Sequence, residues 1–214
     1  MIISEKVSRR TMQDFKEIFS HYQPKPLGEK QCYAVFLPLV WNSRAGSWEV
    51  LYQVRSEGIS QPGEVSFPGG AVEKGETLKE AAVRETMEEL KLSLQEIEVW
   101  GEMDYLVSNR RTIHCFVGQL LVDDWRQIQP NEEVAHLFTI PLKTLKNHPP
   151  TYYQLETEVQ ETDDFPFDRI RNGSNYKFSH YDRRIPFYDV TEETLWGMTA
   201  QFTHRFTDIL NGKQ

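Results

Sequence analysis

Three glutamates, Glu85, Glu88 and Glu89, have the spacing that brings carboxylates together on one side of a helix. At 100° per residue, the three positions fall within an arc of about 100°. Like charges at these spacings repel and weaken a helix, unless a cation lies over them. A hard divalent cation with oxygen ligands is the natural candidate, although most glutamate-rich helices are only solvated. The three glutamates are therefore candidate metal ligands.

The residues just before this cluster favour a metal site over a solvated surface. The stretch Phe67-Pro68-Gly69-Gly70 places two glycines where backbone can approach a ligand closely. Thr77 is a predicted helix N-cap, and Glu80 three residues later completes a capping box. The other side of the predicted helix can face a core. It carries Val83, Thr86, Met87 and Leu90.

Residues 70–92 resemble the signature sequence of the Nudix hydrolases. That signature runs Gly, five residues, Glu, seven residues, then Arg-Glu-apolar-x-Glu-Glu-x-Gly-apolar. The matching residues are Gly70, Glu76, Arg84, Glu85, Glu88, Glu89 and Leu92. Thr86 replaces an aliphatic residue, and Lys91 replaces the final glycine. We expect Lys91 to adopt the left-handed conformation that closes a helix, at a cost of about 1 kcal/mol.

The resemblance implies an α/β fold, the Nudix α/β/α sandwich, in which a mixed sheet lies between helices. It also implies hydrolysis of a pyrophosphate bond in a nucleoside diphosphate derivative, with Mg²⁺ or Mn²⁺ as cofactor. Glu85, Glu88 and Glu89 would be catalytic residues and metal ligands, and the Gly69 carbonyl would be a further ligand. One glutamate would accept a proton from the attacking water, and the spacing leaves open which one.

Arg84 belongs to the same predicted catalytic group. It lies four residues from both Glu80 and Glu88, so we expect it to pair with these acids and fix the geometry of the carboxylates. Glu76 is expected to be a structural partner within the motif, and not a metal ligand.

Residues 55–70 resemble the sequence that marks the coenzyme A pyrophosphatase branch of the Nudix proteins. The branch pattern runs Leu-Leu-x-x-Arg-Ser, a short gap, then His-x-Gly-x-Val-x-Phe-Pro-Gly-Gly. The matches are Leu51, Arg55, Ser56, Gly63, Val65, Phe67, Pro68, Gly69 and Gly70. Tyr52 replaces the second leucine, and Gln61 stands where the pattern has histidine. Residues 195–200 also resemble the Ile-Trp-Gly-x-Thr-Ala stretch of this branch.

This second resemblance implies that the substrate is coenzyme A or an acyl or oxidised derivative of it. The products would be adenosine 3',5'-bisphosphate and 4'-phosphopantetheine. One alternative is a Nudix hydrolase of another substrate, such as ADP-ribose, NADH or a nucleotide sugar. Another is a non-catalytic Nudix-type nucleotide-binding regulator, although a regulator has no need of three repelling acids.

Several residues outside the motif could reach the substrate, and each also has an ordinary structural explanation. Arg55 and Gly70 are candidate substrate-binding residues, although Arg55 could equally form a surface ion pair. Glu132 and Glu133 could add a carboxylate at the metal, or simply begin a strand or helix. The adjacent Arg110-Arg111 could meet phosphates or be solvated. Five aromatic residues could hold a long substrate or form core: Phe165, Phe167, Tyr176, Phe178 and Tyr181.

The length of 214 residues and the net charge of −8 limit the remaining possibilities. We expect an N-terminal helical extension over 1–30 and a Nudix hydrolase domain over 31–214 that includes a C-terminal helix. The net negative charge of the chain argues against a nucleic-acid partner, because phosphate binding needs clustered lysine and arginine. The sequence shows neither an apolar membrane span nor a secretory signal, so we expect a cytoplasmic protein with a small nucleotide substrate. A homodimer is left open, and Cys32 and Cys115 are expected to be reduced.

The elements that must position the cluster follow from the apolar pattern. Spacing over 11–22 predicts an N-terminal helix packed on the domain. An Asn172-Gly173 hairpin turn is expected within 151–190, and a helix over 191–210 that opens at a Thr191 cap. Apolar or alternating runs predict strands over 33–41, 48–55, 64–67, 97–101, 103–107 and 112–122.

Overall fold

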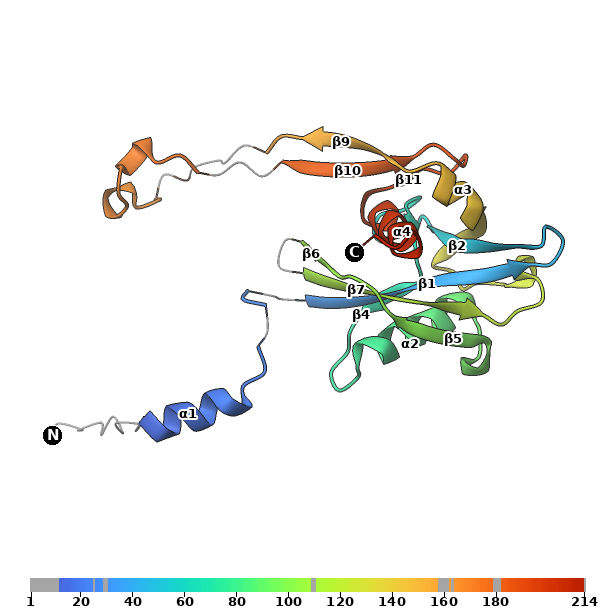
Figure 1. The fold of residues 1–214 in the computed structure, drawn as a ribbon, viewed down its shortest axis with the longest axis horizontal. Helices are drawn as coiled ribbons and strands as arrows, with labels where there is room; N and C mark the ends of the chain where they lie inside the picture. Colours follow the sequence, from blue (N-terminus) through green and yellow to red (C-terminus); the bar gives the residue numbers. More distant parts are fainter. Residues whose placement is uncertain are drawn as a thin grey trace.

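The computed structural model describes residues 12–24, 26–28, 31–108, 111–157, 162, 164–178 and 182–213 (Figure 1). Arg110 and Tyr181, which the sequence singles out, lie outside the described residues. Among the described helices, none has both the length and the apolar character needed to cross a membrane.

A large mixed sheet forms the centre of the molecule. Its main path runs β3-β2-β1-β7-β5, with β4 paired to β1, β6 to β7 and β8 to β2. β1 and β7 pair in parallel, and the other pairs are antiparallel. The strands are β1 (Gln31–Asn42), β2 (Ser47–Arg55), β3 (Val65–Ser66), β4 (Gly69–Ala71), β5 (Ile97–Glu102), β6 (Leu106–Ser108), β7 (Arg111–Leu120) and β8 (Val134–Pro141).

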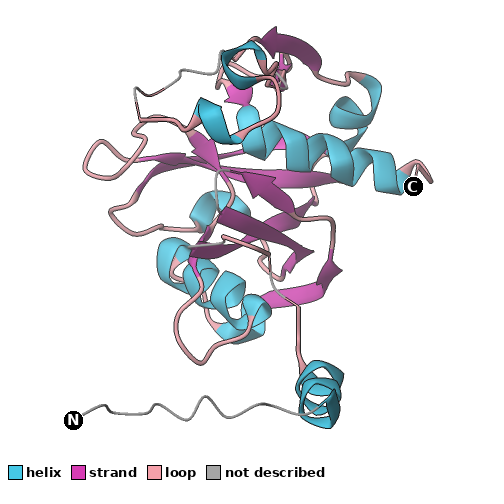
Figure 2. Cartoon of the chain, turned by 90° about the vertical axis from the view of Figure 1, so that its left-hand side faces the viewer, coloured by secondary structure: helices cyan, strands magenta, loops and turns pink. Residues whose placement is uncertain are grey.

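Helices cover both faces of this sheet, so the predicted α/β/α sandwich is confirmed. α2 (Leu78–Leu90) lies on one face and α4 (Gly197–Leu210) on the other (Figures 1 and 2). Alternation along β1 supplies both cores: Ala34 and Phe36 pack with α2, while Leu37 and Leu39 pack with the α4 side. The near-continuous apolar run of β1 is therefore explained by burial on both faces.

A second, separate sheet of three strands packs against α4. It consists of β9 (Thr151–Leu155), β10 (Arg183–Tyr188) and β11 (Leu195–Trp196), in the order β11-β10-β9. α3 (Leu142–Asn147) joins β8 to β9 and packs against α4. Short 3-10 helices occupy Leu94–Glu96, Trp125–Gln127, Phe167–Arg169 and Gly173–Asn175.

The local signals around α2 give the structure that the sequence predicts. The Thr77 hydroxyl accepts a hydrogen bond from the Glu80 amide, and the Glu80 carboxylate accepts one from the Thr77 amide, which completes the capping box. Lys91 closes the helix in the left-handed conformation, with φ 52° and ψ 42°. Both ends of the helix that carries the glutamates are thus fixed by local sequence.

The N-terminal helix differs from the expectation. α1 (Met12–His21) forms, but it is not packed on the domain: Phe15, Ile18 and Phe19 are 42–72% exposed, and α1 lies apart in both views (Figures 1 and 2). The physical reason is that α2 and α4 already cover both faces of the sheet. A further amphipathic helix therefore finds no free sheet face within this chain.

Two expectations for the C-terminal third are also wrong. α4 begins at Gly197 and not near Thr191, because Leu195 and Trp196 form β11 against β10. The Asn172-Gly173 pair does have positive φ at both residues, 77° and 52°. It does not join two paired strands, however, because β9 and β10 are connected by the whole of 156–182.

Smaller differences concern strand ends and the strands that are absent from the predicted set, which are β4, β8, β9, β10 and β11. In 103–107 only Leu106 and Val107 are in a strand, and in 64–67 only Val65 and Ser66 are. Gly69–Ala71, expected as loop, forms β4 and pairs with Tyr33, Ala34 and Val35 of β1. This pairing holds the glycine pair beside α2.

Candidate active site

A cavity of about 370 Å³ opens where β1, β4 and β7 meet the end of α4. Glutamates of α2 reach it from one side of the sheet and residues of α4 from the other. Its lining comprises Tyr33, Val35, Arg55, Ser60, Gln61, Ser66, Phe67, Gly69, Gly70, Glu85, Glu89, Arg111, Ile113, Glu133, Met198, Thr199 and Phe202. The motif glycines, two of its glutamates and the 55–70 segment therefore share one cavity.

Glu89 is the most buried acid of the cluster, with only 4% of its surface exposed. Its Oε2 accepts hydrogen bonds from Gln53 Nε2 at 3.0 Å and from the Gly69 amide at 3.1 Å. Burial is the largest cause that raises the pKa of Glu89 to about 7, and the charges of Glu85 and Glu133 add to it. The sequence places Glu89 on the side of the helix away from the core, yet residues of β2 and β4 cover that part of α2.

Arg84 joins the acids of the motif. Its guanidinium donates two hydrogen bonds to Glu76, at 3.0 and 3.1 Å, and others to Glu85 at 2.9 Å and Glu88 at 3.5 Å. Hydrogen bonds from Arg84 lower the pKa of Glu76. The expected pairing with Glu80 is wrong, because the Glu80 carboxylate is used by the helix cap.

Glu85 is held against the glycine pair. A Cβ on Gly70 would collide with the Glu85 carboxylate in its present position, so a larger residue there would displace this side chain. A Cβ on Gly69 would lie 2.5 Å from the carbonyl oxygen of Ala34. Burial raises the pKa of Glu85, and the negative charges of Glu88 and Glu133 raise it further against the opposing effect of Arg84.

This arrangement fits a divalent cation. The donors are carboxylate oxygens, which Mg²⁺ and Mn²⁺ prefer, and the negative charge of Glu133 helps to raise the pKa of both Glu85 and Glu89. A cation at this place would offset that mutual repulsion. Within the described residues no three acidic, His or Cys side chains already converge as ligands of one ion. Arg84 contacts one carboxylate oxygen of Glu85 and one of Glu88.

The other candidates from the sequence are placed as follows. Arg55 lines the cavity, but its side chain is hydrogen-bonded to Ser60. The Arg55 Nε donates to the Ser60 carbonyl oxygen at 2.8 Å, and Nη2 donates to the Ser60 hydroxyl at 3.2 Å. Among described residues it forms no ion pair.

Glu133 and Arg111 also line the cavity, and Glu132 does not. Of the listed aromatic residues that are described, none lines it; instead they contact one another, as Phe165–Phe167, Phe165–Phe178 and Tyr176–Phe178 pairs.

Several residues that line the cavity or contact its glutamates escape sequence reasoning. Gln53 is 1% exposed, and within the described structure its Oε1 has no hydrogen-bond partner. Its position on β2 gives no sign that it faces a glutamate. Met198 and Phe202 form an apolar wall from α4, and the sequence hints at them only through the adjacent 195–200 stretch.

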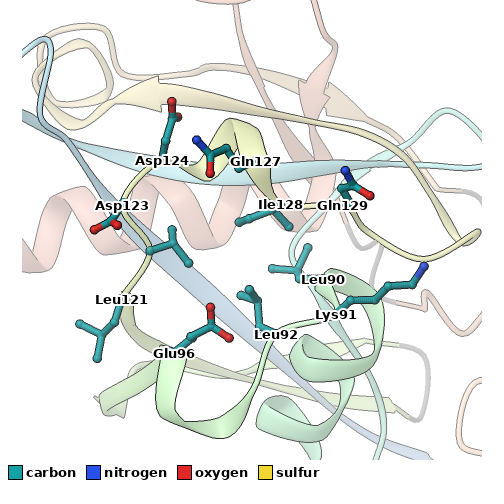
Figure 3. A pocket seen from close by; sticks show the side chains of 11 residues that line it. Leu90, Lys91, Leu92, Glu96, Leu121, Asp123, Asp124, Gln127, Ile128 and Gln129 are labelled. Atoms are coloured by element: carbon teal, nitrogen blue, oxygen red, sulfur yellow. The ribbon is translucent and has the colours of Figure 1, made fainter.

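A second cavity, of about 550 Å³, lies at the C-terminal end of α2 (Figure 3). Its lining includes Lys91, Glu96, Asp123 and Asp124, together with leucine and glutamine side chains (Figure 3). It contains none of the clustered glutamates and neither glycine of the pair. Although this cavity is larger, we place the active site in the first one, because the convergent carboxylates decide the chemistry.

The raised pKa of Glu89 predicts a pH-dependent stability for the metal-stripped protein. A carboxyl whose folded pKa lies above its unfolded value stabilises the fold below about pH 4.5, and this contribution disappears as pH rises through about 7. We expect the free energy of unfolding to fall by about 2 kcal/mol more between pH 5 and pH 8 than it does in Glu89→Gln. Urea titrations at both pH values measure this difference.

Glu88→Gln is the matched control, because the Glu88 side chain is 58% exposed on the same helix. It should keep the pH dependence of the unmodified protein. If the free energy of unfolding depends on pH equally in the unmodified and Glu89→Gln proteins, folding does not raise the pKa of Glu89.

Comparison with known proteins shows the family to which this chain is similar. Residues 30–180 match the family model of the NUDIX domain. The mouse "Peroxisomal coenzyme A diphosphatase NUDT7" is 34% identical over 67% of this chain and 62% of its own length. The human "Mitochondrial coenzyme A diphosphatase NUDT8" is 31% identical over 83% of this chain and 68% of its own length.

A bacterial relative matches over nearly the whole chain. "Uncharacterized Nudix hydrolase NudL" of an Enterobacter species is 32% identical over 89% of this chain and 90% of its own length. In fold, the crystal structure of a MutT/nudix family protein from Enterococcus faecalis matches with a TM-score of 0.53, covering 95% of this chain and 71% of that one. Its sequence identity of 11% makes this a likeness of fold alone.

Proposed function

Since this chain belongs to the Nudix family and is a pyrophosphohydrolase of small nucleotide substrates, we propose that it hydrolyses coenzyme A or an acyl or oxidised derivative of it. The products are adenosine 3',5'-bisphosphate and 4'-phosphopantetheine. Two relatives that are 31–34% identical carry the name coenzyme A diphosphatase, which supports this choice.

The observation that carries the proposal is the meeting of two distant stretches at one cavity. Both residues 55–70 and residues 195–200 resemble the coenzyme A branch, and hydrogen bonds join them. Trp196 Nε1 donates to Glu64 Oε2 at 2.7 Å, and Thr199 Oγ1 donates to the Val65 carbonyl at 2.9 Å. Each stretch also contributes side chains to the cavity lining. Residues that resemble one branch thus build one site together.

The chemistry of the lining suits a substrate with a charged and an uncharged part. Carboxylates and arginines surround the polar end, while Val35, Ile113, Met198 and Phe202 form an apolar wall. The thiol-ended arm of coenzyme A is long and uncharged, and it can lie along such a wall. Gln61 lines the same cavity and offers a phosphate a hydrogen bond without a positive charge.

Nudix enzymes depend on a divalent cation, and we propose that Mg²⁺ or Mn²⁺ is held here by Glu85, Glu88 and Glu89 with the Gly69 carbonyl. The bound ion neutralises diphosphate charge and lowers the pKa of the attacking water. Arg84 positions the carboxylates through its contacts with Glu76 and Glu85. One carboxylate of the cavity accepts the proton of the water.

Competition between substrates tests the proposal. The purified protein is offered coenzyme A, ADP-ribose, NADH, diadenosine polyphosphates and a nucleotide sugar at equal concentrations, with Mg²⁺ or Mn²⁺. We expect kcat/KM for coenzyme A to be among the highest. A clear preference for ADP-ribose, NADH or a nucleotide sugar would overturn the coenzyme A assignment and leave the general pyrophosphohydrolase activity standing.

We also propose that residues 31–214 form the hydrolase domain and that residues 1–30 are a helical extension. The start of β1 at Gln31 and of the family match at residue 30 support this division. A cytoplasmic location and a homodimer remain predictions. The names of two relatives place those proteins in the peroxisome and the mitochondrion.

A further inference from the structure

Arg111 occupies the rim of the active-site cavity at the start of β7. The parallel register of β1 and β7 sets Gln31 beside Arg111 and Tyr33 beside Ile113. Arg111 is exposed, and its guanidinium carbon lies 5.8 Å from the centre of the Tyr33 ring. Both residues line the cavity that holds Glu85 and Glu89. The aromatic ring therefore supports a cation at the edge of the site.

The hydrogen-bond donors of Arg111 are not engaged in the way that those of the other arginines near the site are. Arg55 donates to Ser60, and Arg84 donates to the motif acids. Within the described part of the chain, the Arg111 guanidinium forms no ion pair or hydrogen bond, and its contact is with the Tyr33 ring. A guanidinium carries five N–H donors that match the geometry of a phosphate. Arg111 is thus available to an anionic group of the substrate.

The position of Arg111 along the sheet indicates which anionic group it meets. Gly69 of β4 pairs with Val35 of β1, and Val35 lies beside Cys115 of β7. Arg111 is four residues before Cys115, which is about 13 Å along the strand. An extended arginine side chain covers about half of that distance. With the diphosphate at the proposed cation site beside Gly69, Arg111 reaches a group roughly one sugar ring away from it.

We propose that Arg111, supported by the Tyr33 ring, binds the phosphate monoester on the ribose of the substrate. It makes the site selective for nucleotides that carry a 3'-phosphate in addition to their 5'-diphosphate. This inference rests on the proposed function, because coenzyme A carries such a phosphate. It also goes beyond it, because it names the residue that separates coenzyme A from its 3'-dephospho form.

The test compares the binding of two nucleotides that differ by this phosphate alone. Calorimetry with Mg²⁺ measures Kd for adenosine 3',5'-bisphosphate and for adenosine 5'-monophosphate, neither of which carries the scissile bond. We expect the unmodified protein to bind the bisphosphate about tenfold more tightly or better, since a charge-assisted, bidentate contact is strong. In Arg111→Ala the two Kd values should become nearly equal, and Arg111→Lys should restore part of the difference.

Arg126→Ala is the matched control. The Arg126 guanidinium carbon also lies over an aromatic ring, 4.8 Å from the Trp125 ring centre, but neither residue lines the active-site cavity. This variant should keep the full preference for the bisphosphate. Tyr33→Phe retains the ring and should keep the preference as well, whereas Tyr33→Leu should reduce it. Unchanged thermal unfolding of each variant shows that the fold is intact.

A parallel assay separates this inference from the proposed function. In each variant, kcat/KM is measured for coenzyme A and for 3'-dephospho-coenzyme A, and the inference predicts that Arg111→Ala loses activity on the first only. If coenzyme A is not hydrolysed but Arg111 still sets the preference for the bisphosphate, the proposed substrate fails and the inference stands. If coenzyme A is hydrolysed and Arg111→Ala keeps the preference, Arg111 is only solvated and the inference is overturned.

Discussion

Replacing Glu89 with glutamine lowers kcat at saturating Mg²⁺ by at least about 10²-fold while the protein stays folded. The amide keeps the size of the side chain but removes a charge that the proposed cation needs. Glu89 is the most buried acid of the cluster, so water screens its charge least there. Steady-state kinetics over a range of Mg²⁺ concentrations separates the loss of rate from a loss of metal affinity.

Glu88→Gln should also lower kcat at least about 10²-fold, and the metal dependence should distinguish the two variants. The Glu88 side chain is 58% exposed and forms a long contact with Arg84, so its loss should raise the Mg²⁺ concentration needed for half-maximal activity. Glu98→Gln is the control, because Glu98 lies on β5 and accepts a hydrogen bond from Trp100 Nε1, outside the cavity. Near-normal rates in Glu88→Gln and Glu89→Gln would mean that these acids have only a structural role in the helix and do not bind the cation.

Stripping divalent cations should abolish hydrolysis. Without a cation, the carboxylates Glu85, Glu89 and Glu133 present negative charge to a negatively charged diphosphate. Activity should return on addition of Mg²⁺ or Mn²⁺ to the same sample, which shows that the stripped protein is not denatured. Thermal unfolding provides a second readout, because a cation that binds the folded state raises the unfolding temperature. Full activity in excess chelator would contradict the metal-dependent account.

Local sequence predicts the structure around the site well where local rules decide it. The capping box of Thr77 and Glu80 and the left-handed Lys91 both depend on neighbouring residues, and both are present. The pattern of α2 also brings two of the three predicted glutamates, Glu85 and Glu89, to one cavity, whereas Glu88 does not line it. These features require no knowledge of the rest of the fold.

Contacts between distant segments are where the sequence falls short. The burial of Glu89 depends on Gln53 and Gly69, which arrive through the pairing of β2 and β4 with their neighbours. The partners of Arg84 were expected from helical spacing, yet two hydrogen bonds go to Glu76 in the preceding loop. Helical geometry treats a helix as isolated, so it cannot show which of its faces other strands will cover.

The apolar wall of the cavity illustrates the same limit over a longer range. Met198 lies 128 positions after Gly70 in the chain, and both line one cavity. Periodicity shows that the C-terminal helix is amphipathic, but not which part of the sheet it covers. Strand β11, which pairs with β10, delays the start of α4 until Gly197 and so sets Met198 at the mouth of the site.

The most direct test of the account is to identify the products formed from coenzyme A. Purified protein is incubated with coenzyme A and Mg²⁺, and the products are separated and weighed by mass spectrometry. The account predicts adenosine 3',5'-bisphosphate and 4'-phosphopantetheine in equal amounts, with neither formed when chelator is present. Intact coenzyme A after prolonged incubation, or release of inorganic phosphate with 3'-dephospho-coenzyme A, would contradict it.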